Sequence, residues 1–397
     1  MNQTKTLAQQ AREEHKGEYA GDFVLKGQKM HEAFTHVNAD WLKKTKTFEQ
    51  MIKEAREFQA TCKDLEGAEL KDLKAVNGEI TVPNYNRPMT PSEHAITQLG
   101  IRSGVPGWYL QKLLLERNDA ELFDTNVNKG IEEEGKGSAF LRVREVGGVT
   151  TLRALLTNRY AVLNNLPVIE TLGEVMPGGR VSHLFYNGDT FRANILVPDC
   201  LRSEDDSDYG GGISVLNDEI GRFKFRQRPF VFRAICFNGN VWDRKDGTEF
   251  SKRHLGEINW TEFRKNIIMN IQAQLPLVNE KIEKVLALKG LPLTQQEIEQ
   301  TIVYIGQREN LTQKVQAKWY EGFKVELAKA KTASTILSAF GVVQGATRAA
   351  QELPFEMQEM LETLSGRLVD GNWEKLVNGA KASVELEDAK AILELVA

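Results

Sequence analysis

Between Ser138 and about Trp242 the apolar residues of this chain recur at every second position, whereas on both sides they recur at every third or fourth. A period of two is typical of a β-strand with one buried face, and a period of 3.6 is typical of an amphipathic helix. The pattern therefore predicts an α+β protein. It has a helical N-terminal lead-in, a central antiparallel β-rich core with a packed helix, and a helical C-terminal tail.

The pattern divides the 397 residues into four expected segments. These are a polar N-terminal arm at 1–36, a helical lead-in at 37–137, the β-rich core at 138–250 and a helical C-terminal region at 251–397. Within the core, the segment from Ser138 to Tyr160 is expected to form a β-hairpin that turns at Gly147-Gly148.

Three local signals predict where helices begin and end. Apolar spacing predicts a helix from Asn38 to Cys62. Thr90-Pro91-Ser92-Glu93 has the form of a capping box with proline at the first helical position, so a helix is expected to start there. Pro276 is expected to break the first helix of the C-terminal region, because proline lacks the amide hydrogen that a helix interior needs.

One predicted strand of the core carries a row of cations at alternate positions. The row consists of Arg222, Lys224, Arg226 and Arg228. Residues two apart share one face of a strand, so the row would line about 20 Å of that face. Phe223 and Phe225 would then point to the opposite, core-facing side. One guanidinium group can donate to two phosphate oxygens at once, so the row favours a phosphate-binding face.

Other parts of the predicted core also carry cations on one face of a strand. Arg142 and Arg144 share a face of the hairpin, and aromatic residues next to cations, above all Tyr160 and Phe237, are candidates for stacking on single-stranded bases. The candidate nucleic-acid-binding residues are Arg142, Arg144, Arg153, Arg159, Tyr160, Arg222, Lys224, Arg226, Arg228 and Arg233.

An alternative interpretation of the row stays open. Neighbouring cations repel one another unless carboxylates or other anions face them. The same face would therefore also suit a solvated sheet whose charges are neutralised by Glu145, Glu219 and the acidic loop at 204–208. That loop, with Asp199, also offers oxygen ligands for a divalent ion, but its spacing matches no EF-hand loop and a solvated loop is favoured.

A second candidate motif lies between Gln98 and Leu113. Its glycine turn and apolar spacing fit a DNA-binding helix-turn-helix, in which Trp108, Gln111 and Lys112 would point outward. Helix pairs with such a turn are also common as packing elements, and the flanking residues are not basic. Packing is therefore the favoured interpretation.

Properties of the whole chain limit its function. A net charge of −4 argues against general affinity for nucleic acid, so any such site must be local. No segment approaches the roughly 20 apolar residues of a membrane helix, and no secretory signal is visible, so a cytoplasmic protein without membrane contact is expected. The three cysteines form no CxxC and the common catalytic motifs are absent, so no catalytic residue, metal ligand or cofactor is expected.

Three segments carry a resemblance to a known family. Thr157-Asn158-Arg159-Tyr160, 216–221 and 233–239 resemble, in this order, a family found in phages and plasmids and catalogued as a domain of unknown function. The resemblance spans about residues 90–380. It departs at Asp218, where that family usually has serine, and at Phe237, where threonine is usual.

This resemblance has implications for function. Genes of that family tend to lie in phage replication and recombination neighbourhoods. The family's basic sheet resembles the core of strand-annealing proteins related to Rad52, which is an analogy of fold. The resemblance therefore implies a role in handling single strands during replication or recombination.

The basic row and the resemblance together predict a phage-type single-strand DNA-binding protein. It would anneal or protect strands without a chemical step, and would not be an enzyme. DNA is favoured over RNA as the partner, and homo-oligomers are expected because one chain's face reaches only a few nucleotides. The alternative is an interaction protein that modulates a host or phage polymerase or a defence system through its basic face. A metal-dependent nuclease comes third, on the acidic loop alone.

Overall fold

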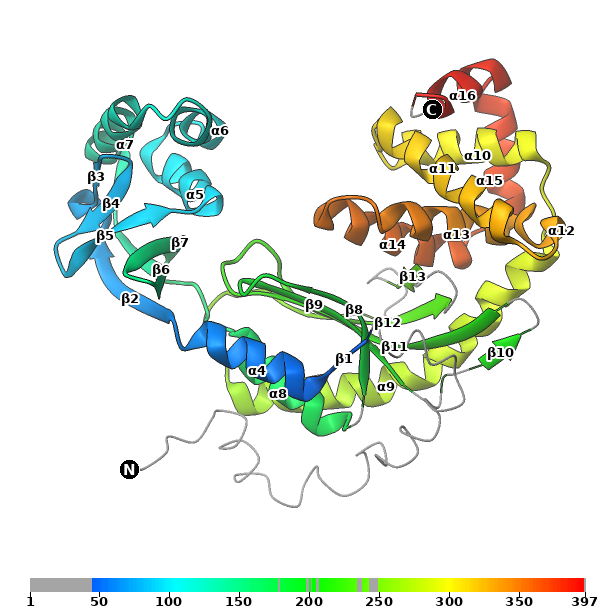
Figure 1. Ribbon diagram of the computed structural model, residues 1–397, viewed down its shortest axis with the longest axis horizontal. Helices are drawn as coiled ribbons and strands as arrows, with labels where there is room; N and C mark the ends of the chain where they lie inside the picture. Colours follow the sequence, from blue (N-terminus) through cyan, green and yellow to red (C-terminus); the bar gives the residue numbers. More distant parts are fainter. Residues whose placement is uncertain are drawn as a thin grey trace.

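The structure is a computed structural model, and it combines two β-sheets with three groups of helices (Figure 1). The described residues are 45–177, 179–197, 200, 202–204, 207–233, 238–242 and 249–395. The α+β class and the helical C-terminal tail are confirmed. The expected N-terminal arm at 1–36 lies outside the described residues.

The first lobe, residues 62–157, contains a six-stranded sheet in the order β2-β6-β7-β5-β4-β3. Its strands are β2 (Cys62–Glu69), β3 (Lys74–Val76), β4 (Glu79–Val82), β5 (Tyr85–Pro91), β6 (Ser138–Val146) and β7 (Val149–Thr157). β6 and β7 form the predicted hairpin, and β5 runs parallel to β7. Its helices are α5 (Glu93–Ser103), α6 (Gly107–Gln111), the π-helical turn Lys112–Glu116 and α7 (Ala120–Glu134). Helices and sheet enclose a separate apolar core around Leu99 and Leu141.

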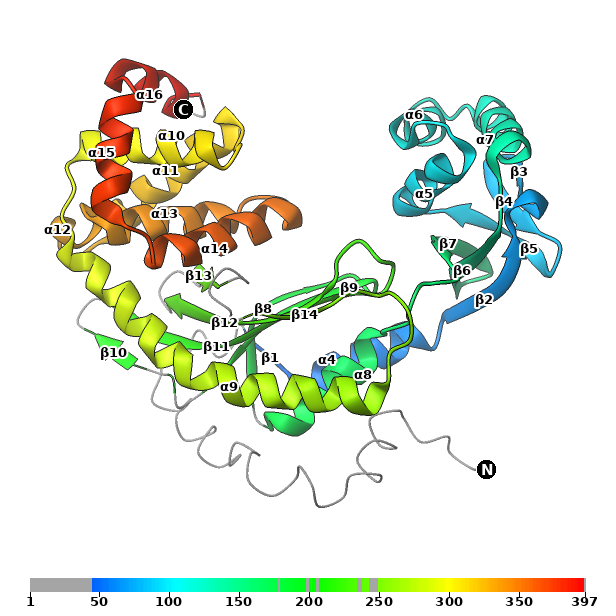
Figure 2. The ribbon, with the colours of Figure 1, turned by 180° about the vertical axis from the view of Figure 1, so that it is seen from behind.

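The second lobe is built on an eight-stranded antiparallel sheet. Its strands are β1 (Lys46–Thr47), β8 (Arg180–Tyr186), β9 (Thr190–Leu196), β10 (Arg202–Glu204), β11 (Ser207–Asp218), β12 (Phe225–Arg233), β13 (Asn238–Val241) and β14 (Phe250–Lys252). The helices α4 (Phe48–Gln59), α8 (Asn165–Val175) and α9 (Trp260–Ala287) lie along one side of the sheet (Figure 2). The second apolar core lies between these helices and the sheet, and it also includes side chains of the C-terminal helices.

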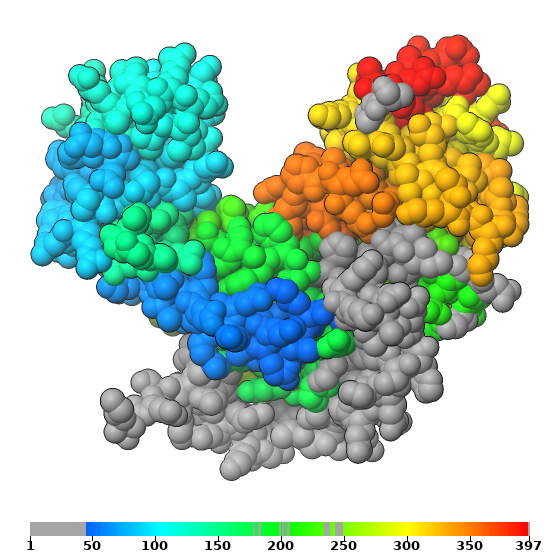
Figure 3. Space-filling view, viewed as in Figure 1, coloured from blue at the N-terminus to red at the C-terminus, as the bar shows by residue number. Residues whose placement is uncertain are grey.

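The C-terminal helices lie on the other side of this sheet (Figures 1 and 2). They are α10 (Gln295–Arg308), α11 (Gln313–Lys329), α12 (Ala333–Ile336), α13 (Ala339–Ala350), α14 (Phe355–Val369), α15 (Trp373–Ser383) and α16 (Leu386–Leu393). Together with the first lobe they border an open hollow above the second lobe (Figure 3). Among the described helices, none has the length and apolar character needed to cross a bilayer.

The first lobe is an insertion within the second. β1 pairs with β8, and α4 packs on α8, so the segment from Lys46 to Gln59 belongs to the second lobe although it precedes the first. The structure thus divides the chain differently from the expected boundaries at 137 and 250. The hairpin expected to open the β-rich core completes the sheet of the first lobe instead, because β6 pairs with β2 and β7 with β5.

Three predicted helix boundaries were wrong. The described part of the Asn38–Cys62 prediction is helical only over α4, which starts after the capping residue Thr47. α5 is capped by Ser92, whose side chain accepts from the Ala95 amide, because the two residues before it pair in β5. α9 continues through Pro276, because its apolar face stays buried against the sheet beyond this residue.

Candidate nucleic-acid interface

The half of the cation row that lies on β12 faces α14. Arg228 is fully buried and Arg226 keeps 30 % of its side-chain exposure, and both guanidinium groups contact the Glu359 carboxylate. Arg192 on β9 lies 3.1 Å from Glu359 and also contacts Glu362. Burial opposes ionisation of Glu359, but Arg228 and Arg192 outweigh it and lower the pKa to about 2. These ion pairs fasten α14 to the sheet.

The other half of the row precedes β12, on the turn that follows β11. Arg222 pairs with Asp218 at 3.1 Å, and Lys224 pairs with Glu249 at 2.6 Å. Asp218 also accepts from the backbone amides of Ile220 and Arg222, so its carboxylate shapes the turn. Arg222 and Lys224 keep part of their surface in solvent. The expectation of one open basic face is therefore wrong for Arg228 and holds only in part for the others.

The carboxylates that neutralise the row are also not the expected ones. Glu145 pairs with Lys63, and Glu204 of the acidic loop pairs with Arg202. Asp199, Asp205 and Asp206 lie outside the described residues. Within the part of the chain that the structure describes, no group of three His, Cys, Asp or Glu side chains is placed to hold a metal ion.

Two hairpin arginines are buried where the lobes meet. The Nε of Arg142 donates to Asp64 at 2.8 Å, and its Nη1 donates to the Glu219 carbonyl oxygen at 2.7 Å. Arg153 donates to Asp189 at 2.6 Å and to the Glu219 carboxylate at 2.7 Å. Burial disfavours the charge of Arg153, but the two carboxylates prevail and raise its pKa. These arginines join the first lobe to turns of the second, and they offer little surface to a ligand.

The remaining candidates lie in different surroundings. The Arg144 guanidinium lies 4.4 Å from the centre of the Phe58 ring. Arg159 is exposed. Arg233 is buried and pairs with Glu326 at 3.0 Å. Phe237 lies outside the described residues.

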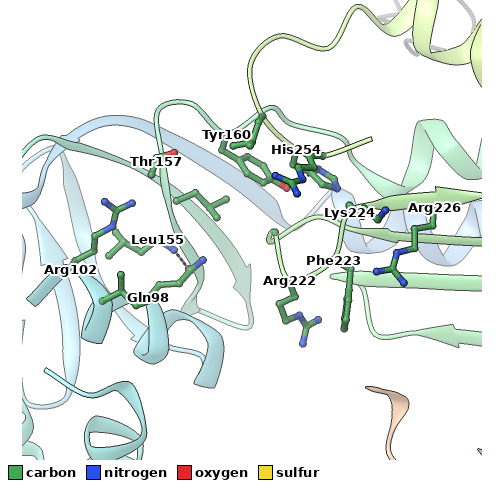
Figure 4. Close-up of a pocket in the computed structure, with 15 residues that line it drawn as sticks. Gln98, Arg102, Leu155, Thr157, Tyr160, Arg222, Phe223, Lys224, Arg226 and His254 are labelled. Carbon is green, nitrogen blue, oxygen red and sulfur yellow. Dashed lines mark hydrogen bonds between the residues drawn. The ribbon is translucent and has the colours of Figure 1, made fainter. Parts of the chain in front are cut away.

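A cavity of 640 Å³ opens between the two lobes (Figure 4). Five of its lining residues are cations and none is a carboxylate; the cations are Arg102, Arg222, Lys224, Arg226 and Arg253. In Figure 4, Arg102 lies on the α5 side and faces Arg222, Lys224 and Arg226 across the cavity. Phe223, which was expected to face the core, lines this cavity instead, whereas Phe225 is buried as expected.

Arg102 and Arg253 differ from the other three cations. Neither pairs with a carboxylate among the described residues, so their charges are free to meet a ligand. Sequence reasoning missed both. Arg102 lies on α5 and Arg253 follows β14, and no local pattern marks either residue because only the fold brings them together.

Tyr160 and His254 lie at the edge of the cavity between its two sides. The Tyr160 hydroxyl donates to the Glu219 carbonyl oxygen at 2.7 Å, and its ring stacks with Phe140 and with His254. Tyr160 is therefore already engaged in contacts within the chain, and its stacking on a base stays a prediction. Burial lowers the pKa of His254 to about 4, so its imidazole is neutral near pH 7, and its Nε2 has no hydrogen-bond partner.

Gly221 holds the cation-bearing turn against Tyr160. Its φ of +81° lies in the left-handed region. A Cβ at this position would lie 3.3 Å from the Tyr160 ring. Thr157, Tyr160 and Gly221 belong to the first two segments that carry the family resemblance, so these segments meet at the cavity. The third begins at Arg233, at the far end of β12.

The helix-turn-helix candidate is a packed pair, α5 and α6. A Cβ on Gly100 would lie 2.8 Å from the Gly107 Cα, so the helices touch at these glycines. The Gln111 amide donates to the Glu93 carbonyl and to the Thr97 hydroxyl, both at 3.0 Å. Gln111 is thus used in packing, as the favoured interpretation expected. Trp108 remains exposed.

Comparisons with protein-family models, with curated proteins and with solved structures found no match. The resemblance of the three segments to the phage and plasmid family therefore stays a prediction. Any function has to be supported by the geometry of the chain itself.

Proposed function

We propose that this protein binds single-stranded nucleic acid, with the phosphates in the cavity between the lobes, and carries out no chemical step. The observation that supports this most is the lining of that cavity by five cations and no carboxylate. Cations gathered in a concave, partly enclosed site raise the local potential and attract anions. Guanidinium groups, which make up four of the five, match the geometry of phosphate oxygens.

The binding contacts differ from the row expected from the sequence. Arg142, Arg153, Arg228 and Arg233 are buried in ion pairs, and breaking such a pair leaves an uncompensated charge that costs about 3–5 kcal/mol. Phosphate contacts by Arg102 and Arg253 would break no ion pair, because neither residue pairs with a carboxylate among the described residues. We therefore assign them the first phosphate contacts, with Arg222, Lys224 and Arg226 adding to the attraction.

The size and lining of the cavity favour a single strand. Its 640 Å³ falls in the range of pockets for small ligands, about 300–1,000 Å³, so it would hold a few nucleotides but not a double helix. Two exposed apolar side chains, Ile101 and Leu255, lie beside the cations. The cations would contact phosphates, which carry no sequence information, and the apolar side chains would pack against the bases.

Two further parts of the proposal rest on the sequence. The preference for DNA over RNA follows from the resemblance to a family encoded near phage replication and recombination genes. Because one cavity covers only a few nucleotides, we expect several copies of the chain to act together on a strand. Strand annealing or protection is the role that such an assembly would serve.

The salt dependence of binding tests the proposal. An end-labelled strand of about 40 nucleotides, several site sizes long, would be titrated with the full chain at about 50–300 mM salt. Replacing Arg102 and Arg253 by alanine removes up to two phosphate contacts, so the slope of log affinity against log salt should fall by up to about 1.4. The matched control replaces Lys53 and Lys129, two exposed cations that do not line the cavity.

Three outcomes would contradict the proposal in different ways. An absence of binding by the unmodified chain rejects it outright. An equal loss in the control and in the cavity variant would show that only overall charge matters. A slope that is shallow from the start would favour the interaction protein, since a packed protein interface releases few counterions.

A further inference from the structure

A stripe of exposed apolar side chains runs over α5, α6 and the π-helical turn of the first lobe. Ile101 is 74 % exposed, Trp108 68 % and Leu115 51 %. Lys112, also exposed, lies four residues after Trp108, one helical turn further along the same surface. Tryptophan is highly buried on average, which makes its exposure on this surface informative.

The stripe is continuous with the cavity. Ile101 belongs to both, and its neighbour Arg102 supplies one of the free cations. α5 and α6 touch at Gly100 and Gly107, so Trp108 directly follows the contact with the helix that carries Ile101 and Arg102. Figures 1 and 2 both show α5 and α6 on the side of the first lobe that faces the C-terminal helices across the open hollow.

The packing of the helix pair does not use these side chains. Gln111 is the member of α6 that bonds back to α5. The Trp108 and Tyr109 rings meet in an edge-to-face arrangement with ring centres 5.9 Å apart, and 68 % of Trp108 stays exposed. Lys112 pairs with no carboxylate among the residues described.

We propose that a base of the bound single strand stacks on Trp108, while Lys112 contacts a phosphate next to it. This inference rests on the proposed function and deepens it, because it gives the bound strand a path over the protein surface, from the cavity over Ile101 to α6. The chemistry of the stripe supports this occupant. An aromatic face accepts any base, and Arg102 and Lys112 place positive charge at both ends of the path.

The inference is tested by Trp108→Ala on strands of two lengths. A strand of about 4 nucleotides fits the cavity alone, whereas one of about 12 nucleotides also reaches α6. Trp108→Ala should weaken binding of the longer strand by about 5- to 150-fold and leave the shorter one unchanged. Its salt slope should stay as in the unmodified chain, because stacking releases no counterions. Trp108→Phe, which keeps a ring, should recover part of the affinity.

Leu122→Ala is the matched control, since Leu122 is an exposed apolar residue of the same lobe on α7. Photocrosslinking of a bromouracil-containing strand should attach to the peptide that contains Trp108. The fold is not at risk, because replacing an exposed side chain changes stability only slightly in most cases. Melting curves of all variants would verify this.

The outcomes separate this inference from the proposed function. If Arg102 and Arg253 matter for binding but Trp108→Ala binds both strands normally, the inference is wrong and the function stands. If the unmodified chain binds neither strand, both are wrong. If Trp108→Ala instead lowers the mass of the free protein in light scattering without weakening the longer strand, the stripe is an interface between copies, and the inference is wrong.

Discussion

The ring of Tyr160 lies parallel to the imidazole of His254, with ring centres 5.4 Å apart and an angle of 5° between the planes. The Tyr160 hydroxyl oxygen is 3.2 Å from the His254 Nδ1. The pair forms one edge of the cavity, and it links the end of the hairpin to the segment that carries Arg253. The protonation state of the Tyr160–His254 pair therefore affects both lobes.

Acid should destabilise the protein between about pH 6.5 and pH 4. Burial lowers the pKa of His254 from 6.5 to about 4, so within this window the unfolded chain binds a proton that the folded chain rejects. The free energy of unfolding should fall by up to about 3 kcal/mol from this group as the pH drops. Denaturant titrations at several pH values measure it.

His254→Gln is the variant that checks this assignment, because glutamine does not titrate. His94, whose pKa burial also lowers, contributes with the same sign, so part of the pH dependence should remain. A variant with the full pH dependence of the unmodified chain would show that His254 is not responsible.

Removing the Glu359 carboxylate should destabilise the fold strongly. Glu359→Ala leaves Arg192 and Arg228 buried without this carboxylate, and losing one partner of a buried ion pair costs about 3–5 kcal/mol. Glu356, exposed on the same helix, is the control, and its replacement should cost no more than about 0.5 kcal/mol. Equal melting temperatures for the two variants would contradict a structural role for the ion pairs.

Two arginines of the row should have opposite roles. Arg228→Ala should lower stability and leave the salt slope of single-strand binding unchanged, because this side chain is buried against Glu359. Arg222→Ala should lower the salt slope by up to about 0.7, because its guanidinium lines the cavity, although it also removes the cation that faces the buried Asp218 carboxylate and so costs some stability. Stability and binding curves for both variants check this. If Arg228→Ala lowered the salt slope and Arg222→Ala did not, the phosphates would bind on the sheet face rather than in the cavity.

A methyl group at Gly221 should disturb the cation-bearing turn. Gly221→Ala meets both an unfavourable left-handed backbone and the Tyr160 ring. Gly148 in the hairpin turn has nearly the same φ, +83°, but no atom lies close to where its Cβ would be. Gly148→Ala should therefore lower stability only by the cost of the left-handed backbone, about 1–2 kcal/mol. Gly221→Ala should therefore lose more stability and also bind strands more weakly. Equal effects of the two changes in thermal melts would show that the Tyr160 contact is unimportant.

The features that sequence patterns predicted correctly are local ones. The hairpin from Ser138 to Thr157 follows from apolar alternation around a glycine turn. The helical C-terminal tail follows from apolar residues that recur at every third or fourth position. Such signals depend on residues that are close together in the sequence, so they can be recognised without knowing the fold.

The partners of the cations could not be predicted in this way. Asp218 lies four residues before Arg222 and was within reach of a local argument, but Glu359 lies 131 residues after Arg228 and depends on where α14 docks. The same holds for the cavity, since Arg102 and Arg253 come from different lobes. A period of two shows that side chains share a face, but it does not show what covers that face.

The insertion of the first lobe has a consequence for the order in which this protein takes shape on the ribosome. Chains fold domain by domain as they emerge. The first lobe is continuous in sequence and carries its own apolar core, so it is complete once Thr157 has left the exit tunnel. α4 emerges earlier but has to wait for α8 and β8, which are made only after the entire insertion. The oldest described segment of the nascent chain thus finds its place only after the whole first lobe has been made, and its apolar face stays uncovered while the first lobe folds beside it.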